Sequence, residues 1–315
     1  MKKISLFLVS FFVAIIAFCQ STGTDNYWQQ QVNYTIDVTL NDVDHTLDGY
    51  IKMEYINNSP DTLHFIWIHL WPNAYKNDRT AFSDQLLENG RTDFYFSDND
   101  KRGYINRLDF KVNGTRVKML DHPQHQDIIK IILAKPLAPY STCKIETPFH
   151  EKISANFSRG GHTGQAYQLT QWYPKPAVYD RKGWHPIPYL DQGEFYSEFG
   201  DYKVVITLPE KYVVAATGKL TDSTNASAAL KTLSFEQNNV HDFALFADKK
   251  FIVAHDTLQL PSSKIIDVYA YYLPDAKYNS WSKATQFIKH AILTRSNWLG
   301  EYPYNIVSAV EAPMG

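Results

Sequence analysis

Apolar and polar residues alternate along most of the chain, which is the pattern of β-strands with one buried face. The alternation is clear over residues 33–40 and 47–55. Residues 63–70 are almost continuously apolar, which predicts a strand buried on both faces. Similar patterns predict strands at 105–112, 127–133, 143–149, 202–208, 212–218 and 242–247, separated by turn signals such as Asn113-Gly114. Many short strands with this spacing predict a mainly β fold, either a β-sandwich or a saddle-like sheet.

The pattern changes after about residue 250. Residues 265–273 are strand-like, and 305–310 return to strand after Gly300 and Pro303. Between them, apolar residues recur every three, four or seven positions, which predicts an amphipathic helix. We expect its broad apolar face to contain Trp281, Ala284, Phe287, Ile288, Ala291, Ile292, Trp298 and Leu299. We therefore predict an all-β domain at 27–250 and, at 251–315, the opening strand, helix and strand of an incomplete α/β domain, since ~65 residues could hardly bury a core alone.

Two polar segments interrupt the strands. Residues 73–103 show no sustained period, so we expect a long loop with one helical turn near residues 81–87. Residues 159–164 contain three glycines beside Arg159. A phosphate-binding loop would also require a lysine between a strand and a helix. A flexible hairpin loop is therefore the simpler interpretation.

Composition narrows the classes of partner. The 315 residues are 44% hydrophobic and 20% charged, as expected for a globular protein. The formal net charge of −2 gives no reason to expect nucleic acid or an anionic membrane as a partner. The aromatic content of 15%, with 21 tyrosines, favours β structure.

The N-terminus has the three parts of a signal peptide. Lys2 and Lys3 precede an apolar run over residues 4–18, and small residues at 17 and 19 allow cleavage before Gln20. We predict a signal peptide at 1–19 and an exported protein, periplasmic or secreted, without other membrane contact. The alternatives are an uncleaved anchor, for which the run is short against the ~20 residues of a spanning helix, and a lipid on Cys19. Cleavage after Cys19 leaves Cys143 alone, and we expect it to be a buried, inert thiol.

The eleven histidines do not form a zinc-binding pattern. His122 and His125 are suitably spaced, but Pro123 lies between them and the general-base glutamate is missing. His64 and His69 are separated by an odd number of residues, which places them on opposite faces of a strand. We expect neither a metal site nor a catalytic residue within this chain.

Two acidic features allow more than one interpretation. His241-Asp242 resembles part of a catalytic dyad, but no Gly-x-Ser-x-Gly motif accompanies it, and a turn before a strand explains it better. The acidic residues of the 191–201 segment could form a calcium site or a carboxylate pair. Their spacing does not match an EF-hand loop, so a solvated link between strands is the simpler interpretation. They are Asp191, Glu194, Glu198 and Asp201.

The segment 167–200 concentrates tyrosine, tryptophan and proline and ends in Gly-Glu-Phe-Tyr-Ser-Glu-Phe-Gly. Together with other short motifs, it resembles the N-terminal half of the M1 family of zinc aminopeptidases, in the form common among secreted bacterial members. The resemblance covers about residues 27–315. The other motifs are Leu70-Trp71-Pro72-Asn73, Thr170-Gln171-Trp172-Tyr173-Pro174-Lys175, Tyr179-Asp180, Ala216-Thr217-Gly218, Asp242-Phe243-Ala244 and Glu301-Tyr302-Pro303-Tyr304.

The resemblance implies a β domain followed by a thermolysin-like catalytic domain, of which 251–315 would be the start. It also implies substrate-binding positions. Thr170-Gln171 matches a family segment that reads the substrate N-terminus, with Gln171 in the pocket and Tyr173 where the family carries an acid or amide. Met314 and Gly315 resemble the approach to the family's Gly-x-Met-Glu-Asn motif. The family's zinc ligands come later, so we expect zinc in the full-length protein and none bound by this segment.

The resemblance thus predicts a fragment of an exported zinc aminopeptidase, with a peptide as the substrate of the full-length protein. Zinc would polarise the scissile carbonyl and activate water. The segment alone, which has no His-Glu-x-x-His, should be inactive. The alternatives are a non-catalytic β-sandwich binding module, favoured by Trp67, Trp71, Trp172 and Trp184, and a pseudo-enzyme scaffold. An uncovered apolar face on the helix at 281–299 would argue against a self-sufficient scaffold.

Overall fold

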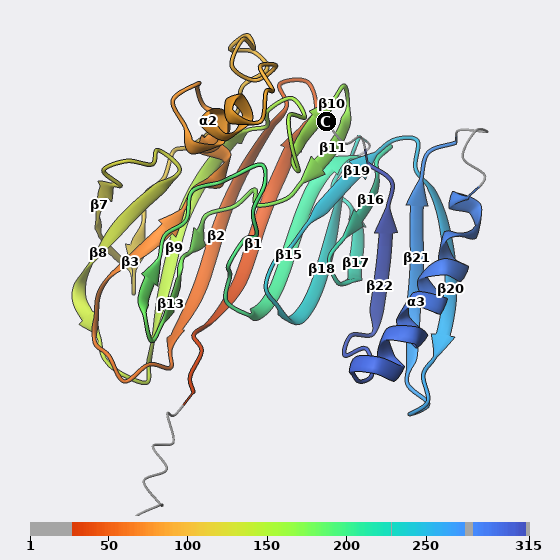
Figure 1. The fold of residues 1–315 in the computed structure, drawn as a ribbon. Helices are drawn as coiled ribbons and strands as arrows, with labels where there is room; N and C mark the ends of the chain where they lie inside the picture. Colours follow the sequence, from red (N-terminus) through yellow and green to blue (C-terminus); the bar gives the residue numbers. More distant parts are fainter. Residues whose placement is uncertain (1–26, 228, 275–279, 313–315) are drawn as a thin grey trace, which may run out of the picture.

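The computed structural model describes residues 27–227, 229–274 and 280–312. The predicted signal peptide at 1–19 and the positions Met314 and Gly315 lie outside these residues. Strands dominate the described chain, and its helices are α2 (Ala81–Glu88), α3 (Ala284–Leu299) and two 3-10 turns, η1 (Trp71–Tyr75) and η2 (Trp281–Lys283). The prediction of a mainly β fold is confirmed (Figure 1).

The largest sheet contains nine strands within the described residues. Its order is β17-β18-β15-β1-β2-β9-β5-β6, and β4 also pairs with β9. The parallel pairing of β1 with β15 brings the start of the described chain beside residues about 170 positions later. The strands are β1 (Gln31–Asn41), β2 (Thr46–Asn57), β4 (Tyr104–Asn106), β5 (Lys111–Val112), β6 (Thr115–Arg116), β9 (Ser141–Lys152), β15 (Gly200–Pro209), β17 (Lys219–Asn225) and β18 (Leu230–Val240).

Two smaller sheets supply the second layer. One has the order β12-β3-β8-β7 and the other β10-β11-β19-β16, while β13 and β14 form a separate ribbon. Their buried residues, such as Ile68 and Leu245, join Ile36 and Ile51 of the large sheet in one core. The strands are β3 (Leu63–His69), β7 (Lys118–Asp121), β8 (Ile128–Leu137), β10 (Gly161–Thr163), β11 (Ala166–Leu169), β12 (Lys175–Pro176), β13 (Val178–Asp180), β14 (Gly183–His185), β16 (Val213–Ala216) and β19 (Leu245–Asp248).

Gly200 begins β15 at a point where two backbones meet closely. A Cβ atom added there would lie 1.6 Å from the carbonyl oxygen of Val32. Next to it, the Val32 amide donates a 3.1 Å hydrogen bond to the carbonyl of Phe199. Only glycine allows this approach. The glycine that ends the motif is therefore required by the close packing of the two backbones, independently of the family resemblance.

The polar segment at 73–103 covers one end of the core. Thr80 caps α2 by accepting a 3.3 Å hydrogen bond from the Ser83 amide. Phe82 and Phe94 of this segment pack with Trp71 in an aromatic cluster separate from the main core. The predicted helical turn near 81–87 is confirmed.

The end of the described chain forms its own small unit. The strands β20 (Ile252–Gln259), β21 (Ile265–Tyr272) and β22 (Ile306–Val310) pair in that order, and α3 covers one face of their sheet (Figure 1). Ile288 and Ile292 of α3 pack on Ile266 and Val268 of β21. Tyr304 links the unit to the large sheet by donating a 2.8 Å hydrogen bond to the carbonyl of Asn239.

The helix predicted over 281–299 is confirmed as η2 and α3, but its single apolar face is not. Phe287, Trp298 and Leu299 are 60%, 77% and 84% exposed, whereas Ala284 is buried. β21 packs only against a narrow stripe of α3 that includes Ile288 and Ile292, so the other large apolar side chains of the helix stay exposed. This agrees with the expectation of a partly uncovered helix.

Some strand boundaries differ from the predictions. The strand predicted at 105–112 is broken into β4 and β5, because Arg107 adopts a left-handed φ of 58°. The strand predicted at 242–247 begins only at Leu245. The expectation that residues 63–70 are buried on both faces is wrong at His64, which is exposed.

Candidate functional site

Three polar side chains meet at the carboxylate of Asp242, just before β19. Oδ1 lies 2.8 Å from Nζ of Lys175 and also accepts the Tyr173 hydroxyl at 2.8 Å. Oδ2 accepts a 3.0 Å hydrogen bond from Nε2 of Gln171. The segment from the end of β11 to the first residue of β12 therefore delivers three side chains to one carboxylate from a distant part of the chain.

The charges of this cluster are paired inside the protein. Lys175 is only 1% exposed, and its ammonium also donates to the carbonyl of His241 at 3.1 Å. Burial lowers the pKa of Lys175, and Asp242 opposes that shift. For Asp242 itself, burial favours the neutral acid, but Lys175 and Tyr173 outweigh it and hold its pKa below the usual value. The lowered pKa keeps Asp242 ionised near neutral pH, and Lys175 lies 2.8 Å away as its counter-ion.

Two tyrosines of the large sheet, Tyr34 on β1 and Tyr202 on β15, support Tyr173 in the cluster. The rings of Tyr34 and Tyr202 stack with centroids 4.4 Å apart, and the hydroxyl oxygens of Tyr173 and Tyr202 lie 3.0 Å apart, with Tyr173 accepting because its own hydrogen is donated to Asp242. Burial raises the pKa of all three phenols. They therefore stay neutral and act as hydrogen-bonding groups rather than as bases.

A small cavity lies beside Gln171. It offers about 20 Å³ to the centres of water-sized molecules, and Trp71, Trp172 and Tyr189 line it. Three acceptor atoms at its wall have no hydrogen-bond partner in the described part of the chain: Oε2 of Glu151 and the amide oxygens of Gln168 and Gln171. Burial raises the pKa of Glu151 well above its ordinary value, which favours the neutral form of its carboxyl group. The wall can thus accept hydrogen bonds from a small donor such as water.

Gln171 holds this position with a backbone φ of 50°, which is unusual for a residue other than glycine. The strained turn directs one side of its amide to Asp242 and the other to the cavity. Such a conformation persists only where the surrounding contacts enforce it. Here the flanking Trp172 does so, because it is 1% exposed and donates from Nε1 to the Phe243 carbonyl at 3.0 Å.

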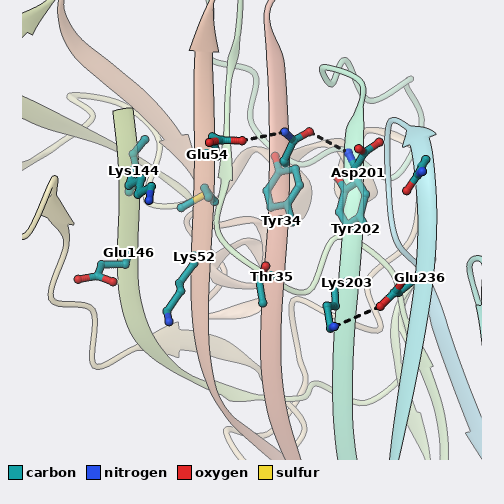
Figure 2. A pocket seen from close by; sticks show the side chains of 14 residues that line it. Tyr34, Thr35, Lys52, Glu54, Lys144, Glu146, Asp201, Tyr202, Lys203 and Glu236 are labelled. Atoms are coloured by element: carbon teal, nitrogen blue, oxygen red, sulfur yellow. Dashed lines mark hydrogen bonds and ion pairs between the residues drawn. The ribbon is translucent and has the colours of Figure 1, made fainter. Parts of the chain in front are cut away.

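A second candidate surface is the polar face of the large sheet (Figure 2). Neighbouring strands carry opposite charges there: Lys144 lies beside Glu54, and Lys203 pairs with Glu236 at 3.2 Å. Asn33 joins two more groups, donating to Glu54 at 3.1 Å and accepting from the Asp201 amide. The charges largely neutralise one another, so this face is a solvated cross-strand ladder and is less specific than the Asp242 cluster.

No group of three or more His, Cys, Asp or Glu residues able to hold a metal ion occurs in ranges 27–227, 229–274 and 280–312. His122 and His125 stack on each other at 4.9 Å, and the His122 ring accepts from two backbone amides. His69 is buried with a pKa lowered to about 3 by burial, which keeps it neutral. Cys143 is buried and its pKa is raised to about 12, as expected for an inert thiol.

The structure brings two predicted binding residues together and adds two that sequence reasoning did not assign to the site. Gln171 and Tyr173 share Asp242, although Tyr173 is 1% exposed and lies in the core. Lys175 was not identified as a site residue, and Asp242 was considered as part of a dyad and assigned to a turn. The available signal for Lys175 was its position between two prolines in a segment of mostly apolar residues. Glu198, assigned to a solvated link, is instead 3% exposed, and that interpretation is wrong for this residue.

Comparison with solved structures finds M1 zinc metallopeptidases. A mutant two-domain M1 zinc metallopeptidase bound to L-arginine matches with a TM-score of 0.56 at 16% identity, over 90% of this chain and 56% of that chain. An M1 zinc metallopeptidase mutant from Deinococcus radiodurans, bound to a Tyr-Ser-Ala substrate, matches with a TM-score of 0.57 at 15% identity and the same coverage. The chain has the fold of M1 zinc metallopeptidases over their matching part.

This likeness establishes the fold, and the chain spans little more than half the length of the structures that it matches. No family model matches the sequence, and no curated protein matches it. Among the described residues, no helix is both long and apolar enough to cross a membrane.

Proposed function

We propose that this chain is the N-terminal part of an exported M1-type zinc peptidase that removes residues from the N-terminus of peptides. The observation that carries the proposal is the structural match to M1 zinc metallopeptidases over 90% of the chain. One of those neighbours holds a tripeptide substrate and another an amino acid. A peptide is therefore the substrate class that we propose for the full-length protein.

Within this proposal, Gln171 and Asp242 contribute to recognition of the substrate's α-ammonium group. Asp242 carries the negative charge that Tyr173 lacks at the matching position, and about a fifth of its side-chain surface is exposed. The buried Tyr173 acts indirectly, by fixing the Asp242 carboxylate with its hydroxyl. Met314 and Gly315, which lie outside the described residues, remain predicted contacts to the peptide backbone.

The described residues do not fit a catalytic zinc ion. The donor set beside Gln171 is two amide oxygens and the Glu151 carboxyl, whose burial favours the neutral form, whereas zinc prefers imidazole, thiolate and carboxylate ligands. We therefore assign no catalytic step to this segment. Its proposed contribution is to shape and charge the wall that meets the end of the peptide.

The proposed domain division places the recognition wall in an all-β domain at 27–250 and the start of the catalytic domain at 251–315. The separate core around Ile266 and Val268 supports it. We also propose that residues 1–19 are removed during export. Sequencing the N-terminus of the protein recovered outside the cytoplasm would test this: a first residue at Gln20 supports cleavage, and an intact Met1 refutes it.

The activity test uses the complete product of the gene. We expect it to hydrolyse aminoacyl-coumarin amides but not their Nα-acetylated forms, and to lose activity with 1,10-phenanthroline and regain it with Zn²⁺. Gln171→Ala and Asp242→Asn should raise KM more than they lower kcat, because they remove substrate contacts. Glu236→Gln, on the solvated face of the large sheet, is the matched control. Equal hydrolysis of the acetylated substrates would refute recognition of the amine.

The structure weakens the alternative of a non-catalytic β-sandwich binding module. Trp71 and Trp172 are 1% exposed and belong to the core. The Phe65 and Trp67 rings are inclined by 82°, so they do not form a flat stacking platform.

A further inference from the structure

A pocket separate from the Asp242 cluster lies beside the β13–β14 ribbon. It offers about 300 Å³ to the centres of water-sized molecules. Its walls are the rings of Trp28, Tyr179 and Tyr196, and its polar groups include Asp180, Arg181 and Glu198. It shares no lining residue with the cavity beside Gln171.

Glu198 is the unusual group in this pocket. Its side chain is buried, yet neither carboxylate oxygen makes a hydrogen bond within the described chain. Burial raises its pKa to about 8, and the Tyr179 backbone amide and the Gln29 side chain oppose this shift without reaching hydrogen-bond geometry. A buried carboxyl group with two unused acceptors is costly unless a donor supplies the missing bonds.

The aromatic walls favour a positive charge. Trp28 and Tyr179 stack with centroids 5.8 Å apart, and the Tyr179 hydroxyl is fixed by a 2.8 Å bond to Asp61. The electron-rich faces of such rings attract ammonium groups, most strongly away from water. The Tyr196 ring, 42% exposed, extends this wall toward solvent.

Asp180 adds a fixed negative charge near the rings. Burial alone would raise its pKa, but hydrogen bonds from His185 and the Lys182 amide dominate and lower it. The two contacts are 2.8 Å and 2.7 Å long. The pocket therefore combines three groups: the buried Glu198 carboxyl, whose oxygens lack hydrogen-bond partners among the described residues, the charged Asp180 carboxylate, and the exposed side chain of Arg181.

We propose that this pocket binds a protonated primary alkylamine, such as the side chain of a lysine residue in a peptide or protein. The ammonium group donates hydrogen bonds to Glu198 and contacts the rings of Trp28, Tyr179 and Tyr196. A primary amine suits the site better than a quaternary one, because only N–H groups can supply the donors that Glu198 lacks.

The test is calorimetric titration of the full chain with Nα-acetyl-lysine-N-methylamide, which carries only a side-chain amine. The blocked α-amine also separates this site from the proposed peptidase site. We expect saturable binding at pH 8 and none by the uncharged Nα-acetyl-norleucine-N-methylamide. Equal binding of both probes, or no saturable binding of the lysine probe, would overturn the proposal.

Two variants and one control locate the binding. Glu198→Gln keeps the shape of the carboxyl group and should raise the Kd at least tenfold. Tyr196→Ala changes an exposed ring, so it should fold normally and raise the Kd about threefold. Glu236→Gln should leave the Kd unchanged. A Kd unaffected by both Glu198→Gln and Tyr196→Ala places the amine elsewhere and refutes the assignment.

Proton release gives an independent readout. At pH 7 an empty site with a Glu198 pKa of about 8 is roughly nine-tenths protonated, so binding should release close to one proton. Titrations in buffers of different ionisation enthalpy measure this number. Glu198→Gln should abolish the release, and unchanged release in that variant would contradict the role of Glu198.

Discussion

Glu198→Gln should stabilise the folded chain, and more so as the pH rises. In the folded state Glu198 has a pKa of about 8, compared with the ordinary value of 4.5. As the pH rises, the unfolded chain therefore loses this proton before the folded chain does. The free energy of unfolding consequently falls as the pH rises from about 4.5 through 8. Above 8 both states are ionised and the difference becomes constant.

The magnitude follows from the two pKa values. Each pH unit between them corresponds to about 1.4 kcal/mol, so the full effect is on the order of 5 kcal/mol. Roughly 4 kcal/mol of it falls between pH 5 and pH 9. Glutamine has the same shape and no charge, so the variant should lack this pH-dependent loss. The advantage of the variant in free energy of unfolding should therefore grow by about 4 kcal/mol over this range.

Urea denaturation followed by tryptophan fluorescence at pH 5, 7 and 9 measures the difference directly. Subtracting the wild-type values removes the contribution of every other titrating group. Glu236→Gln, which changes an exposed carboxylate, should give no comparable trend. Parallel stability curves for wild type and Glu198→Gln between pH 5 and pH 9 would show that Glu198 is ionised in the folded protein and would refute the reasoning.

Three further predictions concern the fold. Gly200→Ala should lower the melting temperature sharply or prevent folding, because the new Cβ would collide with the Val32 carbonyl; calorimetry or circular dichroism checks this. Lys175→Met should cost about 3–5 kcal/mol of unfolding free energy in urea titrations by leaving the Asp242 charge unpaired, and adding Asp242→Asn should restore part of the loss. Trp298→Ser should change the stability by less than about 0.5 kcal/mol and reduce self-association in light scattering, because the ring is 77% exposed; unchanged scattering would argue against a sticky helix surface.

Local patterns predicted the framework because the large sheet buries one face of each long strand. β1, β2, β9 and β15 alternate in the structure as they do in the sequence. β17 was missed because all seven of its residues are exposed, so no apolar face marks it. β18 and β20 were also missed, since their burial departs from simple alternation. Pairing with neighbouring strands, rather than local pattern, decides these elements.

The chemical groups were harder to predict than the strands because their environment comes from distant residues. Asp242 appeared to belong to a turn until β11, β12 and β19 brought Lys175 and Tyr173 to its carboxylate. Glu198 looked like one solvated acid among four, yet the ribbon at β13 and the entry to β1 cover it. In both cases the sequence shows the acid and only the fold determines its charge. A salt-bridged carboxylate and an unpartnered carboxyl therefore have opposite pKa shifts within one domain, and the pH dependence of stability can distinguish them.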